Sequence, residues 1–168
     1  FDLPSKATLS QRDVPGIPRS AIPFLNRSGI SAVSIGANDG STPPDVPPCF
    51  LWEDTASGTS LLGLFTWPGY GEMPLTHQTM CKVDGLTHAL VYNWNGDNAG
   101  PWEASRYRNT WASLAESFPN ANIVASTFDN FTQHLSAVRD KLPVVQSDIG
   151  DTWVYGVPSD PQVRLKKK

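Results

Sequence analysis

Charged side chains are scarce in this chain of 168 residues: 13 Lys and Arg and 16 Asp and Glu leave a formal net charge of −3. The basic run at residues 166–168 is short and stands at the end of the sequence. Nucleic-acid-binding proteins need a basic face, so this composition argues against a nucleic-acid partner. No apolar run approaches the ~20 residues that span a bilayer, which argues against membrane insertion.

Cysteine is rare as well. The two cysteines, Cys49 and Cys81, allow one disulfide or none, and neither lies in the C-x-x-C spacing of a zinc or redox site. Two N-glycosylation sequons, at Asn26 and Asn130, favour a secreted or extracellular glycoprotein, although short sequons also arise by chance.

Proline, glycine and tryptophan are abundant instead, with 15, 13 and 6 residues. Such a chain contains many turns and large apolar anchors. Its length and its 39% of hydrophobic residues fit one domain or a piece of a larger one. We expect a single α/β domain over residues 1–161, a fragment of a larger fold, and a basic tail over residues 162–168.

Apolar runs and helical patterns alternate along the chain. We expect strands at residues 30–35, 50–52, 60–67, 86–94, 122–126 and 143–145, and helices at residues 17–26, 101–117 and 128–139. Strands joined by such helical connections pair in parallel, so we predict an α/β fold with about five mainly parallel strands and flanking helices.

Polar clusters follow several of these strands, at residues 38–40, 69–72, 93–98 and 148–151. In α/β folds the carboxyl ends of the strands carry the active site. The last cluster holds Asp148 and Asp151, with Trp153 and Tyr155 close behind, and carboxylates beside aromatic rings are typical of sugar-binding sites. Acids after a strand also act as turn formers and helix caps, and aromatic residues form core, so both interpretations stay open.

Four motifs carry a resemblance to a known family: R-D-V-P-G at residues 12–16, P-P-D-V-P-P-C-F-L-W at 43–52, G-D-N-A-G-P at 96–101 and D-I-G-D-T-W-V-Y-G-V-P-S-D-P at 148–161. In this order they resemble a poorly characterised branch related to glycoside hydrolase family 38, the α-mannosidase-like enzymes. The chain resembles only the later part of such a catalytic domain. The resemblance implies a partial (β/α)-barrel, a carbohydrate substrate, and another chain or segment that completes the barrel.

The same resemblance assigns Asp13 as catalytic nucleophile and as a ligand of zinc. A carboxylate held by a divalent cation stays ionised and aimed at the anomeric carbon. The implied ligand set is incomplete, because Ile17 stands where the branch has His and the upstream His-x-Asp pair has no counterpart. The three histidines, His77, His88 and His134, show no ligand spacing among themselves.

Asp97, in the G-D-N-A-G-P motif, is the second catalytic candidate, as a general acid or, with Asn98, as a residue that holds sugar hydroxyls. Trp94 and Trp102 flank it and offer faces on which a sugar can stack. The alternatives are a turn-forming role for the acid and a core role for the two rings.

On the enzymatic hypothesis, one pocket collects Asp13, Asp97, Asp148 and Asp151, and mutual repulsion raises at least one of their pKa values. On the opposite hypothesis these acids are separate caps whose pKa values are lowered by backbone amides.

Two functions of different classes follow. The first is a carbohydrate-active domain that hydrolyses or binds glycosides through carboxylates at strand exits. The second is a non-catalytic glycan- or protein-binding module that kept the fold but lost the metal and catalytic constellation, as the absence of histidine at Ile17 and Ala99 suggests.

Overall fold

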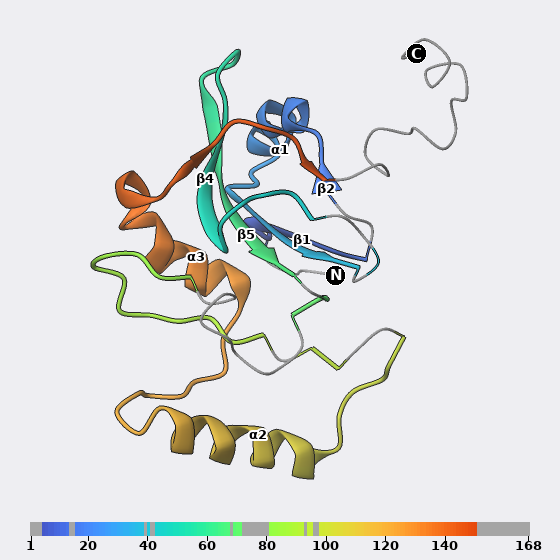
Figure 1. Ribbon diagram of the computed structural model, residues 1–168, viewed down its shortest axis with the longest axis vertical. Helices are drawn as coiled ribbons and strands as arrows, with labels where there is room; N and C mark the ends of the chain where they lie inside the picture. The colour runs from blue at the N-terminus through green and yellow to red at the C-terminus, as the bar shows by residue number, and fades with distance from the viewer. Residues whose placement is uncertain are drawn as a thin grey trace.

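The computed structural model describes residues 5–13, 16–38, 40, 43–67, 69–71, 81–92, 94–95 and 98–150. Over these residues the chain forms an α/β fold, in which helices flank a mixed and mainly parallel sheet (Figure 1). Across the same ranges, no helix combines the length and the apolar character needed to cross a bilayer.

The main sheet has five strands within the described part of the chain, in the order β1-β3-β5-β4-β6. Their bounds are Thr8–Asp13 for β1, Ala32–Ala37 for β3, Cys49–Asp54 for β4, Thr59–Thr66 for β5 and Val144–Val145 for β6. The pairs β1–β3, β3–β5 and β4–β6 are parallel, and β4–β5 is an antiparallel hairpin because only a short turn joins the two strands. The carboxyl-terminal ends of β1, β3 and β5 therefore lie at the same end of the sheet.

The fold also contains helices and a second pair of strands. The 3₁₀ helix η1 covers Arg19–Ala21, α1 covers Ile22–Arg27, α2 covers Ala104–Ser117, α3 covers Phe128–Ser136 and η2 covers Arg139–Lys141. The strands β2, Gly16–Ile17, and β7, Ile149–Gly150, pair antiparallel. Thr127 is the N-cap of α3: its side chain accepts a hydrogen bond from the Asn130 amide and so satisfies one of the free N–H groups of the first turn.

The sheet carries one hydrophobic cluster on each face. The cluster facing α1 contains Ile22, Val33, Phe50, Trp52 and their neighbours. The cluster facing α3 contains Leu62, Leu64, Phe131, Leu135 and the two cysteines. Alternate residues of β4 join opposite clusters, as the two-residue period of a strand requires.

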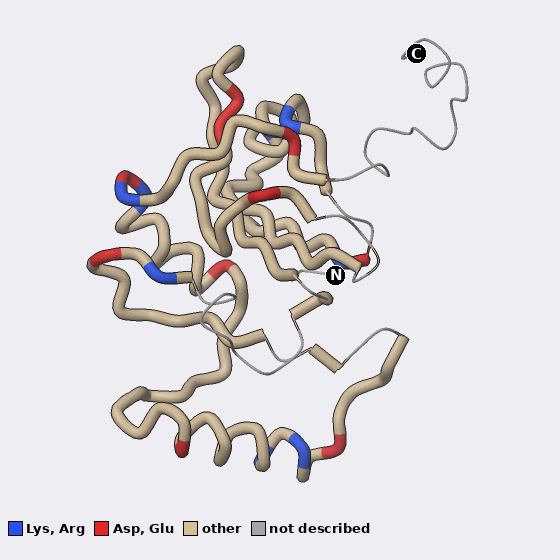
Figure 2. The backbone as a smooth tube through the Cα atoms, viewed as in Figure 1, with Lys and Arg blue, Asp and Glu red and all other residues tan. Residues whose placement is uncertain are grey.

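The helix α2 stands apart from the sheet in Figure 1, at the end of long connections. Leu114 is its buried residue, whereas Tyr107 and Trp111 are 40% and 38% exposed. Figure 2 shows charged residues of both signs spaced along the described backbone, α2 included.

The predicted α/β class, the mainly parallel sheet and the flanking helices are confirmed. The strands expected at residues 30–35, 50–52, 60–67 and 143–145 correspond to β3, β4, β5 and β6. The predicted helices correspond to η1 with α1, to α2, and to α3 with η2. Within the described residues the sheet stays open from β1 to β6, without closing into a barrel.

Two predicted strands are wrong. Residues 122–126 and the described residues within 86–94 form no strand. A strand needs a neighbouring strand for its backbone hydrogen bonds, and no described residue of these two segments pairs with the sheet. Leu86 and Leu90 pack as coil against the cluster facing α3, while Val124 is 63% exposed. The apolar residues Leu86 and Leu90 therefore contact the core without forming a strand, whereas the apolar residue Val124 is exposed.

A disulfide joins Cys49, the first residue of β4, to Cys81 across a sequence separation of 32 residues. We expect the folded protein to take up no thiol label until it is reduced. Closing a loop of this size restricts the unfolded chain, so reduction is expected to lower the free energy of unfolding by about 2–4 kcal/mol. Urea unfolding with and without reductant measures this, and a Cys49→Ser/Cys81→Ser variant serves as a control that reductant does not affect. Two labelled thiols in the unreduced protein would contradict the assignment.

Candidate functional site

Asp13 ends β1 in the left-handed region of backbone conformation, with φ of 76°. This region is uncommon for a residue with a side chain, although Asp tolerates it better than most. Gly16 follows at φ of 97°, and a Cβ atom there would lie 1.8 Å from the carbonyl oxygen of Ile149. Only glycine permits this close approach of β2 to β7, which gives the glycine of the R-D-V-P-G motif a structural reason.

The carboxylate of Asp13 is held by residues from the two neighbouring strand exits. The Tyr70 hydroxyl donates to Asp13 Oδ1 at 2.5 Å, and Asn38 Nδ2 donates to the same oxygen at 3.1 Å. Asn38 Nδ2 also lies 3.2 Å from the Tyr70 hydroxyl oxygen. Two donors therefore fix one carboxylate oxygen, and among the described residues no donor reaches the other, Oδ2.

The strand order explains how these three residues meet. Asn38 follows β3 directly, and an isolated bridge between Ala37 and Gly69 brings the segment after β5 beside it. Tyr70 is nearly buried there, with 8% of its surface exposed. The sequence indicated this arrangement through the polar clusters at residues 38–40 and 69–72, but singled out neither Asn38 nor Tyr70 as a site residue.

Hydrogen bonding keeps Asp13 ionised. The Tyr70 hydroxyl, and after it the Asn38 amide, lower the pKa of the Asp13 carboxyl below its ordinary value, while burial opposes them weakly. An ionised carboxylate with a free oxygen can act as a nucleophile, accept hydrogen bonds from sugar hydroxyls or bind a cation. A lowered pKa is the opposite of what a general acid requires.

The other shifted carboxyl groups of the described residues behave in the same way. A side-chain hydrogen bond with Ser57 is the main cause of the lowered pKa of Asp54, and one with Thr8 is the main cause for Asp129. The raised carboxyl pKa expected of a shared acidic pocket is therefore not found in this part of the chain. Neither Asp54 nor Asp129 was among the acids predicted for the pocket.

Arg12, the neighbour of Asp13, fastens the surrounding segments to the sheet. Its guanidinium donates to the carbonyl oxygen and the hydroxyl of Ser34 at 2.8 and 3.0 Å. It also lies over the rings of Tyr92 and Phe128, 5.6 and 5.4 Å from their centroids. The segment that leads to Trp94 and the start of α3 are thus held beside the Asp13 site.

Trp94 lies against the Tyr70 ring edge-on, with centroids 6.5 Å apart and an interplanar angle of 80°. Of the other two residues predicted nearby, Asn98 is exposed with φ of 53°, and Trp102 packs against α2, where the Arg106 guanidinium lies 4.0 Å from its ring centroid. The structure therefore links Trp94, and not Trp102, to Asp13 through a shared neighbour.

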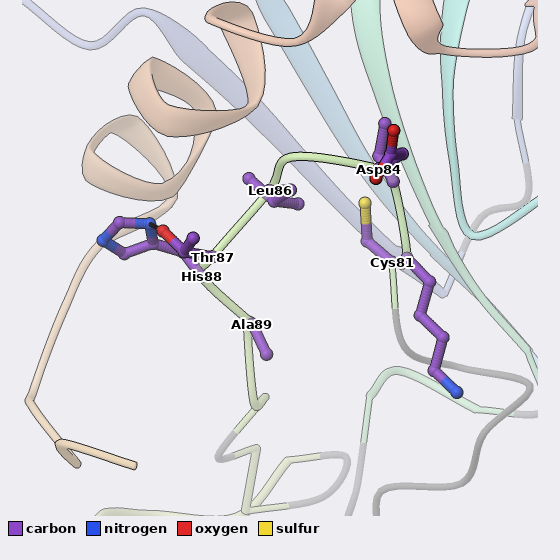
Figure 3. Close-up of a pocket in the computed structure, with 8 residues that line it drawn as sticks. Cys81, Asp84, Leu86, Thr87, His88 and Ala89 are labelled. Atoms are coloured by element: carbon purple, nitrogen blue, oxygen red, sulfur yellow. Dashed lines mark hydrogen bonds between the residues drawn. The ribbon is translucent and has the colours of Figure 1, made fainter.

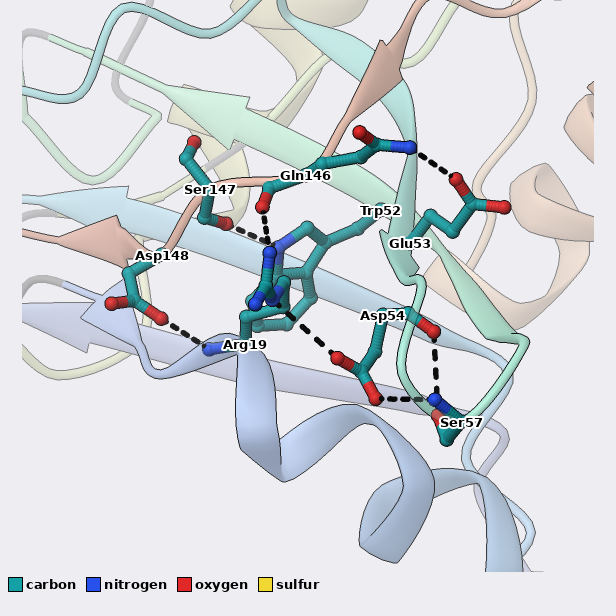
Figure 4. Close-up of polar contacts among 8 residues, drawn as sticks. All are labelled: Arg19, Trp52, Glu53, Asp54, Ser57, Gln146, Ser147 and Asp148. Carbon is teal, nitrogen blue, oxygen red and sulfur yellow. Dashed lines mark hydrogen bonds and ion pairs between the residues drawn. The ribbon is translucent and has the colours of Figure 1, made fainter.

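Asp148 has a structural role at a different place. It accepts a hydrogen bond from the backbone amide of Arg19 at 2.7 Å, while the Arg19 guanidinium donates to the carbonyl oxygen of Gln146 at 2.5 Å and pairs with Asp54 at 3.4 Å (Figure 4). These contacts attach the segment after β6 to η1 and β4. The structure thus places Asp148 beside η1, hydrogen-bonded to the Arg19 amide.

Several predicted residues lie outside the described part of the chain. They are the acids Asp39, Asp97 and Asp151, the aromatic residues Trp153 and Tyr155, His77, and the basic tail at residues 162–168. Their assignments stay predictions.

The donor set around Asp13 does not complete a zinc site within the described residues. No group of three or more His, Cys, Asp and Glu side chains comes together there. The neighbours that contact Asp13 are an amide nitrogen and a phenol, and both act as hydrogen-bond donors towards it. Zinc takes N and S ligands or carboxylates, so Asp13 would be one ligand of the several that zinc needs.

A pocket of about 370 Å³ lies elsewhere, along the segment that begins at Cys81 (Figure 3). Asp13, Asn38 and Tyr70 are not among its lining residues. His88 lines it and stacks on His134 of α3, with ring centroids 3.5 Å apart. Sequence spacing gave no sign of this pair, because the two histidines come from distant segments. The pocket carries no carboxylate cluster, so we place the functional site at Asp13.

Comparison with known proteins adds no family assignment. No protein-family model matches the chain, and no curated protein matches it. The resemblance to glycoside hydrolase family 38 therefore depends on the four motifs alone, and function has to be argued from the geometry around Asp13.

Tyr70→Phe tests the electrostatics of the site. Removing the hydroxyl takes away the largest cause of the lowered pKa, so the pKa of Asp13 is expected to rise towards its ordinary value. A function that requires ionised Asp13 is present above that pKa and is lost as the pH falls through it. The acidic limb of the pH profile, for binding or hydrolysis, should therefore move to higher pH. An acidic limb that stays in place would show that Tyr70 does not control Asp13; Tyr107→Phe, on α2, is the control.

Proposed function

We propose that this chain is a carbohydrate-active domain that hydrolyses glycosides, with Asp13 as the nucleophile. One observation carries the proposal: an ionised carboxylate stands at the common exit of three parallel strands, with Oδ1 held by two donors and no donor to Oδ2 among the described residues. The two donors to Oδ1 fix the carboxylate group and so orient Oδ2, the attacking oxygen, in advance. An enzyme needs this from a positioned nucleophile.

The reaction we assign is the retaining hydrolysis of a glycosidic bond. Asp13 Oδ2 attacks the anomeric carbon, the bond to the leaving-group oxygen breaks, and a general acid gives that oxygen a proton. Water then attacks the same carbon, gives its proton to the former acid, and releases the sugar and the Asp13 carboxylate. Asp97 is our candidate for the acid, from its place in the G-D-N-A-G-P motif.

Features of the fold agree with this proposal. The open sheet with β1 at its edge is compatible with a partial (β/α)-barrel of the family 38 type, which another chain or segment would complete at that edge. The Cys49–Cys81 disulfide is of the kind that persists in oxidising compartments, so a secreted or extracellular location is part of the proposal.

The test is a screen of the purified chain against 4-nitrophenyl α- and β-pyranosides, mannosides included, with nitrophenolate release as the readout. We expect hydrolysis of at least one glycoside, with the anomeric configuration of the substrate retained in the first product. Binding without hydrolysis would replace the enzyme with the non-catalytic glycan-binding module. If the chain neither binds nor hydrolyses any of the sugars, the proposal is overturned.

A further inference from the structure

We propose that Trp94 is a stacking platform for a second sugar ring, so that the substrate of the Asp13 site is a di- or oligosaccharide. This inference rests on the proposed function and adds a substrate class to it. The starting observation is that Trp94 combines two properties: its ring is 40% exposed, and it contacts the residue that holds the nucleophile.

The exposed surface of Trp94 is an aromatic face held in place. The rings of Tyr70 and Trp94 meet in a T-shaped contact, at 80° between the ring planes, and 40% of the Trp94 surface stays exposed beside it. Two residues before it, Tyr92 is anchored beneath Arg12 and packs so closely on Gly71 that a Cβ atom there would lie 2.8 Å from the Tyr92 Cβ. Gly71, at φ of 105°, therefore allows the backbone before Trp94 to lie next to Tyr70.

The order of contacts assigns the platform to a second ring. Asp13 has to contact the anomeric carbon of the first sugar, and Tyr70 contacts both that carboxylate and the indole. The hydroxyl of Tyr70 is 2.5 Å from Asp13 Oδ1, and its ring centroid is 6.5 Å from that of Trp94. Asp13 and Trp94 thus contact different parts of one tyrosine side chain, its hydroxyl and its ring, which suits a platform for a ring next to the one under attack. The apolar face of a pyranose is the chemistry that such an indole recognises.

The experiment compares two substrates of the same sugar. A glycosyl fluoride has one ring and a leaving group too small to stack, whereas the corresponding disaccharide places a second ring beyond the scissile bond. We expect Trp94→Ala to lower the ratio of kcat/KM for the disaccharide to kcat/KM for the fluoride by about 10-fold, mainly through a higher KM, the scale of one lost aromatic contact. Trp94→Phe should restore most of the ratio.

Trp111→Ala is the matched control, because Trp111 is 38% exposed and lies on α2. This substitution should leave kcat/KM unchanged for both substrates. An equal loss on both substrates in Trp94→Ala, or a shift in the acidic limb of the pH profile, would mean that Trp94 acts only by supporting Tyr70 and would overturn the platform. If the parent chain hydrolyses neither substrate, the proposed enzymatic function is wrong, and binding of the disaccharide tests the platform instead. A binding affinity that Trp94→Ala weakens about 10-fold supports the platform. An unchanged affinity, or no binding by the parent chain, overturns it.

Discussion

Asp13→Asn is expected to lower kcat/KM for the hydrolysed glycoside by about 10⁴-fold or more, the scale of loss when the residue that forms the covalent intermediate is removed. The amide keeps the size of the side chain and one oxygen, but it has neither the charge nor the nucleophilicity to attack an anomeric carbon. Sugar binding should survive, because Tyr70 and Asn38 remain in place. Initial rates for hydrolysis and titration calorimetry for binding separate the two effects.

The control for Asp13→Asn is Asp84→Asn. The Asp84 side chain is 99% exposed and has one long ion pair with Lys141, so its loss should leave hydrolysis and folding unchanged. Circular dichroism spectra of the variants establish that the fold is retained. A rate for Asp13→Asn within about 10-fold of the parent rate would be incompatible with catalysis by Asp13, since removal of a nucleophile costs far more.

Trp52→Ala is expected to lower the free energy of unfolding by about 3–5 kcal/mol, the typical cost of deleting a fully buried aromatic side chain. Trp52 is 0% exposed at the centre of the cluster facing α1. Its indole N–H also donates to the carbonyl oxygen of Ser147 at 2.9 Å, so the substitution leaves a cavity and a carbonyl without its donor (Figure 4). Urea unfolding measures the change.

Trp111→Ala again provides the comparison, because the same substitution at a 38% exposed position should cost less than about 1 kcal/mol. Similar costs at both positions would contradict the assignment of Trp52 to the core. Since Ser147 lies between the Gln146 and Asp148 contacts of Arg19, Trp52→Ala should also loosen the attachment of the β6–β7 segment, with earlier amide exchange of the Arg19 N–H.

The elements that could be predicted from sequence are those whose local pattern agrees with their tertiary contacts. The apolar residues of β4 and β5 are buried in the two clusters, and α3 combines a capping threonine with an apolar stripe. The pattern at residues 86–94 resembled these strands, but Leu86 and Leu90 pack as coil against the cluster facing α3. Conversely, β1 was not predicted, because its sequence, T-L-S-Q-R-D, is mostly polar. Its pairing with β3 stabilises it as a strand.

The candidate site was predictable in part. The motif containing Asp13, and the rule that the exits of parallel strands lie together, both indicated the end of the sheet where Asp13, Asn38 and Tyr70 meet. The residues that set the pKa of Asp13 lie 25 and 57 positions away in the sequence, and only the fold brings the Asn38 amide and the Tyr70 hydroxyl to Oδ1. Asp148 illustrates the converse, because its place after a strand also suits a cap for the Arg19 amide.

The central claim, that Asp13 is the nucleophile, is tested most directly by trapping the covalent intermediate. A 2-deoxy-2-fluoro glycosyl fluoride of the hydrolysed sugar carries a good leaving group, and its C2 fluorine slows the breakdown of the glycosyl-enzyme, because the transition state has oxocarbenium character. Mass spectrometry of the intact chain and of its peptides should find one added 2-deoxy-2-fluoro sugar, attached to Asp13. A label on another carboxylate, or an unlabelled chain, would contradict the account.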